Sequence, residues 1–189
     1  MSTVLEFAPP AIRRGEILRY AGVREETPEI AALLDACLAE VGDVIRCKVA
    51  FTEVYPIFEE WAMDIGFARV ESLDLMRSLA GADGVLVFCA TVGIGIDRLI
   101  ARYARIFPAK ALLLEAIGNE RVESLCDAFC AAQNACTRRF SPGYGDLPLS
   151  LQRELLQALD CPRQIGVHLG ESLLMTPQKS VTAFVGIKK

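Results

Sequence analysis

Apolar and polar residues follow two different patterns in the first third of this chain. Residues 27–42, TPEIAALLDACLAEVG, predict a helix. In this segment Thr27 can cap the first turn, Pro28 suits the first helical position, and Gly42 suits the exit. Residues 44–54, VIRCKVAFTEV, instead alternate apolar and polar side chains, which predicts a strand with one face exposed to water.

A continuously apolar run, DGVLVFCAT at residues 83–91, predicts a central strand. We expect further helices at 10–22, 72–81, 97–107, 108–136 and 150–159, and further strands at 164–169 and 180–187. Because helices and strands do not alternate regularly, the order favours an α+β fold over a doubly wound parallel sheet. The expected architecture is an antiparallel sheet flanked by helices.

Composition narrows the class of protein. A chain of 189 residues with 52% hydrophobic and 23% charged residues is expected to form one globular domain over residues 1–189. The net charge of −4 argues against a nucleic-acid partner, although Arg98, Arg102 and Arg105 form a local basic cluster. The apolar stretch at 84–96 is too short to cross a membrane, and residues 1–10 do not form a signal peptide. We therefore expect a cytoplasmic protein without a membrane partner.

Two motifs invite catalytic interpretations that the sequence does not favour. TVGIGIDR at residues 91–98 resembles part of a dinucleotide fingerprint, but Arg98 occupies the place of the third glycine. A tight turn into a helix, with Asp97 in the first helical turn, is the favoured interpretation. His168 is the single histidine, and no catalytic triad can be argued from its spacing. No catalytic residue is therefore assigned.

Three cysteines lie on or near the long helix expected at 108–136. Cys126 and Cys130 share a helix face, where a metal could use both. The spacing of these two and Cys136 matches no zinc or iron–sulfur pattern, so buried thiols are favoured and no metal site is assigned. In a reducing cytoplasm the seven cysteines are expected to stay as thiols.

The segment RRFSPGYGDLPLSLQ, residues 138–152, has the composition of a ligand-binding loop. Arg139, expected at the frayed end of a helix, can bind a carboxylate bidentately. Pro142 and Gly143 allow a turn with positive φ, where backbone can approach a ligand. Tyr144 offers a flat ring and a hydroxyl. These groups suit a zwitterionic small molecule with an aromatic ring. A structural loop with Arg139 paired to a protein carboxylate is equally compatible with the sequence.

A resemblance to a known family adds to this interpretation. Residues 139–144, RFSPGY, match the Arg-x-x-x-Gly-Tyr motif of the activation domain of cobalamin-dependent methionine synthase, which binds S-adenosylmethionine. AIGNERVESLCD at 116–127 resembles the helix before that motif, and residues 165–187 resemble the closing segment of the domain. GEILRYAG at 15–22 resembles stand-alone relatives of the domain. The specific resemblance covers about residues 110–187.

The resemblance implies a site for S-adenosylmethionine. Arg139 would bind the methionyl carboxylate, the backbone of the motif would receive the adenosyl group, and an acidic residue would lie near the sulfonium. The residues implied are Glu123, Arg139, Pro142, Gly143 and Tyr144. The second acidic position of the family is Gln133 here, and Asp146 is a candidate for a substitute charge.

The resemblance also implies a role. The family restores oxidised cobalamin with one electron and the methyl group of S-adenosylmethionine. The present sequence has no Asp-x-His-x-x-Gly element, so cobalamin would lie only on a partner, a corrinoid-binding methionine synthase or methyltransferase. A flavodoxin-type electron donor is a further expected partner. Two alternatives stay open: a scaffold subunit that has lost tight ligand binding, which Gln133 favours, and an independent enzyme that uses S-adenosylmethionine.

Overall fold

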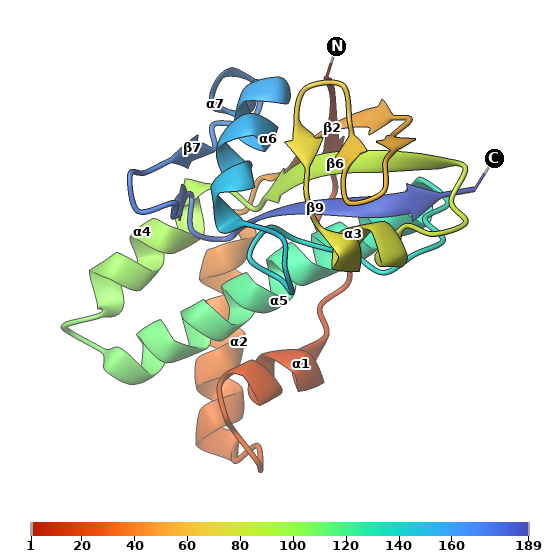
Figure 1. Ribbon diagram of the computed structural model, residues 1–189. Helices are drawn as coiled ribbons and strands as arrows, with labels where there is room; N and C mark the ends of the chain where they lie inside the picture. Colours follow the sequence, from red (N-terminus) through yellow and green to blue (C-terminus); the bar gives the residue numbers. More distant parts are fainter. Residues whose placement is uncertain (1, 189) are drawn as a thin grey trace.

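Four antiparallel strands form the main sheet of the computed structural model, which describes residues 2–188 (Figure 1). The strands are β1 (Thr3–Phe7), β2 (Cys47–Val54), β6 (Gly84–Thr91) and β9 (Ser180–Ile187), in the spatial order β1-β2-β6-β9. Every neighbouring pair in this sheet is antiparallel. The fold is therefore α+β with an antiparallel sheet flanked by helices, as the sequence predicts.

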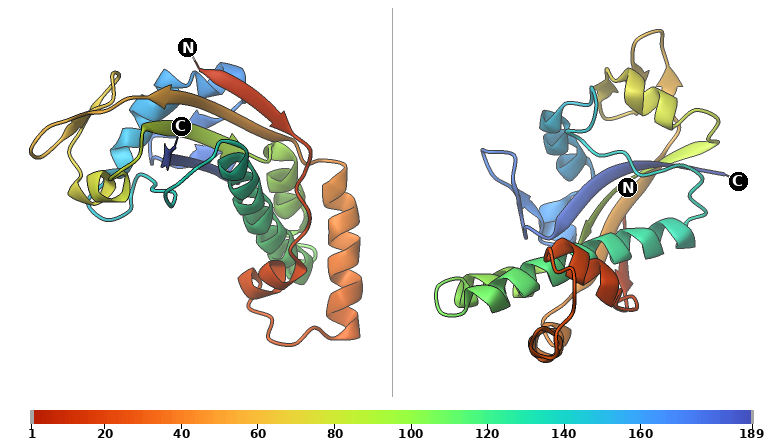
Figure 2. Two further views of the ribbon diagram at one scale, coloured as in Figure 1. Left: turned by 90° about the vertical axis from the view of Figure 1, so that its right-hand side faces the viewer. Right: turned by 90° about the horizontal axis from the view of Figure 1, so that it is seen from below.

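Helices cover both faces of the sheet, and Figure 2 shows the larger group together on one side. This group consists of α1 (Arg14–Tyr20), α2 (Pro28–Gly42), α4 (Ile94–Tyr103) and α5 (Pro108–Ala132). The other face carries α3 (Leu73–Ser78), η1 (Leu149–Leu151), α6 (Gln152–Ala158) and α7 (Cys161–Gln164). Two small antiparallel sheets complete the fold: β3 (Ile57–Phe58) with β4 (Met63–Asp64) and β5 (Arg69–Val70), and β7 (His168–Leu169) with β8 (Met175–Thr176).

Strand β6 explains how one sheet supports two cores. All eight of its residues are buried. Because successive side chains of a strand point to opposite faces, Phe88 packs toward α5 and Val87 toward α3 and α6. Phe88 lies 4.9 Å from Phe129 of α5 between ring centroids. A fully buried side chain of this size contributes about 1.5–3 kcal/mol, so the predicted central strand anchors both layers.

The predicted exposed face of β2 is only partly exposed. Lys48 is half-buried and pairs with Glu6 of β1 at 2.8 Å, as expected for a face in contact with water. Ala50, on the same face, is fully buried in a cluster with α6 and α7. The alternation in the sequence identified the strand correctly, but it carried no information about which helices would later cover this face.

The helix predictions differ from the structure mainly at helix ends. Helix α2 has the predicted bounds, and the Thr27 hydroxyl accepts the Ile30 N–H at 3.4 Å. Helix α1 begins at residue 14 instead of 10, and α4 begins at 94 instead of 97. The two glycines before Asp97 have structural roles: Gly93 precedes α4 with φ 84°, and a Cβ on Gly95, inside α4, would lie 2.6 Å from Val44. These roles account for both glycines without a nucleotide.

The strand predicted at 164–169 is largely wrong. Only residues 168–169 form a strand, while residues 161–164 form α7. Pro162 suits the first turn of that helix, and Ile165 and Val167 are buried without strand pairing. Strand β1 was not predicted, because it is short and is fixed by pairing with the distant strand β2. The small sheet β3–β5 was not predicted, because each of its strands has only two residues.

Candidate functional site

A cavity of about 590 Å³ opens along the outer edge of β9. Strand β9 is an edge strand, and residues 135–140 pair only with its second half, where Phe140 and Phe184 exchange backbone hydrogen bonds of 2.9 and 2.8 Å. The first half, residues 180–182, borders the cavity instead. The lining residues come from α5, the segment after it, α6, β8 and β9: Glu123, Asp127, Cys130, Thr137, Arg138, Arg139, Ser141, Tyr144, Gln152, Met175, Ser180, Val181 and Thr182.

The sequence predicted Arg139 at the frayed end of a helix, but the structure places it in an extended segment. Helix α5 ends at Ala132, four residues earlier than expected, because Asn134 adopts a left-handed conformation with φ 53°. The following residues then run beside β9. Consecutive residues of a helix point about 100° apart, but residues 138 and 139 are extended, and Arg138 lines the cavity as well as Arg139.

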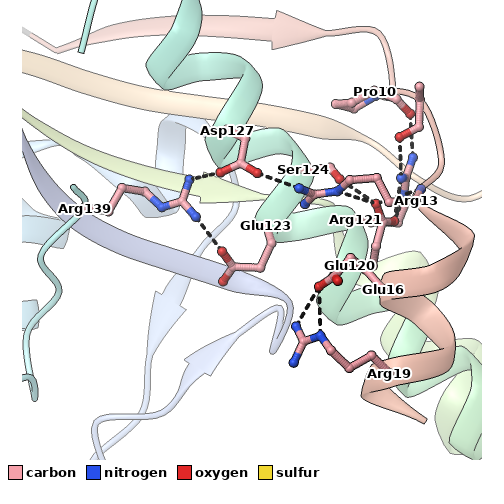
Figure 3. Close-up of polar contacts among 11 residues, drawn as sticks. Pro10, Arg13, Glu16, Arg19, Glu120, Arg121, Glu123, Ser124, Asp127 and Arg139 are labelled. Carbon is pink, nitrogen blue, oxygen red and sulfur yellow. Dashed lines mark hydrogen bonds and ion pairs between the residues drawn. The ribbon is translucent and has the colours of Figure 1, made fainter. Parts of the chain in front are cut away.

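The guanidinium of Arg139 is held by two carboxylates of α5 (Figure 3). It donates to Glu123 Oε2 and to Asp127 Oδ1, each at 2.6 Å. The two acids are four residues apart and therefore lie on one helix face. Burial lowers the pKa of Arg139, but Cys126, Asp127 and Glu123 outweigh burial and leave that pKa above its ordinary value. The structure thus shows Arg139 paired with protein carboxylates, the arrangement that the sequence left open as an alternative.

Asp127 also connects the cavity to the N-terminal segment. Its second oxygen, Oδ2, accepts a hydrogen bond of 2.8 Å from Arg13 (Figure 3). Arg13 in turn donates to Glu120 Oε1 through its backbone N–H at 3.2 Å and its Nε at 3.3 Å. One carboxylate therefore bridges two arginines that are distant in sequence. Sequence reasoning missed Asp127, because its separation of 12 residues from Arg139 follows no local motif.

Glu120 is a fully buried acid in this network. Arg121 lies 2.5 Å from Glu120 Oε2, and the Ser124 hydroxyl donates to Oε1 at 2.5 Å. Arg121 also donates to the carbonyl oxygens of Pro10 and Ala11 at 2.6 and 3.0 Å. Because every charge in this group is paired, the network fixes the N-terminal segment against the helix that carries the cavity acids.

The turn after Arg139 has the predicted backbone conformation. Gly143 has φ 91°, and its N–H donates to the Leu147 carbonyl at 2.8 Å. Pro142 is buried, and neither Pro142 nor Gly143 lines the cavity. Tyr144 does line it, with 60% of its surface exposed and its ring 6.3 Å from that of Phe140. The structure therefore gathers Glu123, Arg139 and Tyr144 at the cavity, with the other two predicted residues in the supporting turn.

Asp146 has a structural role that the sequence did not reveal. Its carboxylate accepts hydrogen bonds from the Ser72 hydroxyl and from the backbone N–H of Leu73 at 2.8 Å, at the start of α3. The Ser72 hydroxyl above all holds the pKa of Asp146 below its ordinary value. Asp146 does not line the cavity, so it does not supply the substitute charge considered for Gln133.

The cysteines are free thiols in the described residues. Burial raises the pKa of Cys126 and of Cys130, although Arg139 acts in the opposite direction on both. Within residues 2–188, no group of three His, Cys, Asp or Glu side chains could hold a metal ion. The helices in the same range include none that is both long and apolar enough to span a membrane.

The fold resembles that of a domain whose structure was solved with a bound ligand. A crystal structure of the MetH reactivation domain bound to AdoHcy superposes with a TM-score of 0.66 and 13% sequence identity. The superposition covers 98% of this chain and 78% of that chain. No protein-family profile and no curated protein sequence matches the chain. At this identity the likeness establishes the class of fold, a reactivation-domain-like α+β fold, and the ligand and role belong to a proposal.

Proposed function

We propose that this chain binds S-adenosylmethionine in the cavity beside β9 and serves as a reactivation subunit for a corrinoid-dependent methyltransferase carried by another chain. The observation that carries the proposal is Arg139 at the wall of a cavity of about 590 Å³, in a fold shared with a domain solved with AdoHcy. This volume lies within the range of about 300–1,000 Å³ typical of small-molecule sites.

The residues of the cavity suit the charges of S-adenosylmethionine. Its carboxylate matches the fork of the Arg139 guanidinium, and the ammonium and sulfonium match the acids Glu123 and Asp127. The ligand supplies an activated methyl group. The chain itself supplies orientation and charge, because a positioned methyl donor needs no general base from this domain.

Binding requires an exchange of partners at Arg139. The ligand carboxylate takes the guanidinium, and the two acids released from it then face the cationic groups of the ligand. Arg139 exchanges its two protein carboxylates for the carboxylate of the ligand, and the ammonium and sulfonium of the ligand pair with the two acids, so this exchange leaves no charge of the site unpaired. The pairing of Arg139 with Glu123 and Asp127 in the structure also supports the alternative of a scaffold subunit, because Arg139 needs no ligand to balance its charge.

A reconstitution assay tests the proposed role. A cobalamin-dependent methionine synthase without its own activation domain is oxidised, then supplied with a one-electron reductant and S-adenosylmethionine, with and without this chain. We expect methyl transfer to return only when both the chain and S-adenosylmethionine are present. Recovery without the chain would contradict a reactivation role. A stable complex between the two proteins without any binding of S-adenosylmethionine would establish the scaffold alternative.

A further inference from the structure

Large apolar side chains gather on the surface at the small sheet β3–β5. Ile57 and Phe58 form β3, Trp61 lies in the connection to β4, and all three are more than half exposed. A groove of about 460 Å³ adjoins Phe58 and is lined along α3 by Leu73 and Met76. We call these five residues the groove surface. Exposed apolar clusters rich in aromatic side chains mark interaction sites, so the groove surface is a candidate interface.

The groove surface lies in an acidic part of the chain. Residues 53–83 contain two basic and seven acidic side chains and so carry a net charge of −5, against −4 for the whole chain. Both basic residues, Arg69 and Arg77, are already in ion pairs with acids of the same segment. Glu60, next to Trp61, has no ion-pair partner among residues 2–188. A partner that surrounds an apolar anchor with basic groups therefore matches this surface.

The turn between α4 and α5 has the opposite charge. Residues 98–114 contain four basic side chains and no acidic one. Three of them are exposed and lack an ion-pair partner in the described part of the chain: Arg98, Arg102 and Arg105. Beside them, Ile106 is 72% exposed and Phe107 is 45% exposed. We call Arg98, Arg102, Arg105, Ile106 and Phe107 the tip surface. It combines exposed apolar side chains with unpaired cations, as the groove surface combines them with acids.

The two surfaces lie at opposite ends of the molecule (Figures 1 and 2), so they cannot meet within one chain. A contact of either surface with its own kind would oppose like charges, which is unfavourable. A contact of groove with tip brings apolar side chains together and places opposite charges around them. We propose that the chain associates with a second copy of itself, with the tip surface of one copy against the groove surface of the other.

This contact is independent of the proposed function. The groove and tip surfaces share no residue with the cavity beside β9. Binding of S-adenosylmethionine should therefore be the same in variants that lose the contact. Because the contact depends partly on exposed charges, it should weaken as salt is added.

Mixing two variants tests the contact. Trp61→Lys places a cation in the groove surface, and Ile106→Glu places an acid in the tip surface. In sedimentation velocity at low salt the parent should associate as its concentration rises, and each variant alone should associate at least about tenfold more weakly. The equimolar mixture should form pairs, because one variant keeps its tip surface and the other keeps its groove surface.

The emission of Trp61 provides a second measurement at the groove surface. Trp61 is the single tryptophan of the chain, so Trp61→Lys has no tryptophan emission. Titration of that variant into Ile106→Glu should shift the emission of the latter to shorter wavelength, because Trp61 leaves water. Leu174→Glu replaces an equally exposed apolar side chain outside both surfaces and should associate as the parent does.

Thermal unfolding of each variant separates a lost contact from a lost fold. Since Trp61 and Ile106 are exposed, we expect the Tm of the parent in both. A second pair, Glu60→Lys and Arg105→Glu, changes charge alone and should give the same mixing result.

Three outcomes would overturn the inference. The first is a parent that stays monomeric at low salt over the whole concentration range. The second is a mixture of folded variants with neither pairing nor an emission shift. The third is binding of a monomeric parent to vesicles of anionic phospholipid, lost in Ile106→Glu, which would assign the tip surface to a membrane surface instead.

Discussion

The guanidinium of Arg139 lies 2.6 Å from Oδ1 of Asp127. An acid of the same chain therefore already pairs with the guanidinium that is proposed to bind a ligand carboxylate. Asp127 also holds Arg13 at 2.8 Å, which ties the position of Arg139 to the N-terminal segment. A ligand therefore enters a site whose charges are paired, and its affinity depends on how well it replaces those pairs.

The first prediction concerns Glu123. S-adenosylmethionine and S-adenosylhomocysteine differ by a methyl group and a positive charge, and in the proposed complex Glu123 faces that charge. Glu123→Gln should therefore lower the affinity for S-adenosylmethionine about two- to fivefold more than that for S-adenosylhomocysteine, the range expected for a partly exposed ion pair. Parallel calorimetric titrations measure the ratio.

Glu154→Gln is the matched control for this prediction. Glu154 is exposed on α6 and does not line the cavity, so its replacement removes the same charge without touching the site. It should leave the ratio of the two affinities as in the parent. An equal change of both affinities in Glu123→Gln would remove the proposed role of this carboxylate at the sulfonium.

The turn at Gly143 gives a prediction about stability. With φ 91°, an alanine at this position is strained, and its Cβ would lie 3.3 Å from Leu149. Gly143→Ala should lower the free energy of unfolding by about 1–2 kcal/mol. Thermal unfolding should show a lower Tm. Gly15→Ala, in α1 with open space and no positive φ, should leave Tm unchanged or higher; a similar loss in both variants would argue against strain at the turn.

Asp146 gives a pH-dependent prediction. Its folded-state pKa lies below its ordinary value, chiefly because the Ser72 hydroxyl donates to the ionised carboxylate. A depressed folded pKa stabilises the fold above the unfolded pKa of about 3.9, and this contribution is lost as pH falls through the folded pKa. Asp146→Asn should therefore have a lower Tm than the parent at pH 7, with the difference shrinking below about pH 4. A constant difference from pH 3 to 7 would contradict this origin.

The sequence predicted those elements whose signals are local. Thr27 and Pro28 mark the start of α2, and the apolar run of β6 marks a strand buried on both faces. It could not predict β1, whose residues pair with β2 40 to 48 positions away, or the end of α5. That end depends on Asn134 taking a left-handed conformation and on the pairing of the next residues with β9, which are tertiary effects.

Part of the site was predictable from the sequence, because some of its residues also carry local sequence signals. The loop composition identified Arg139 and Tyr144, and the family resemblance added Glu123, all three of which line the cavity. Asp127 and Gln152 were missed because each is an ordinary helical residue whose position depends on packing. Asp146 was considered as a cavity charge because its contact with Ser72, 74 residues away in the sequence, has no local signal.

The most direct test of the account is calorimetric titration of S-adenosylmethionine into the parent, Arg139→Ala and Arg138→Ala. Both arginines line the cavity, but only Arg139 holds Glu123 and Asp127 among the described contacts. The account predicts measurable binding by the parent, a loss of at least about tenfold in Arg139→Ala, equivalent to about 1.4 kcal/mol, and a much smaller change in Arg138→Ala. Equal losses in the two variants, or no binding by the parent, would contradict it.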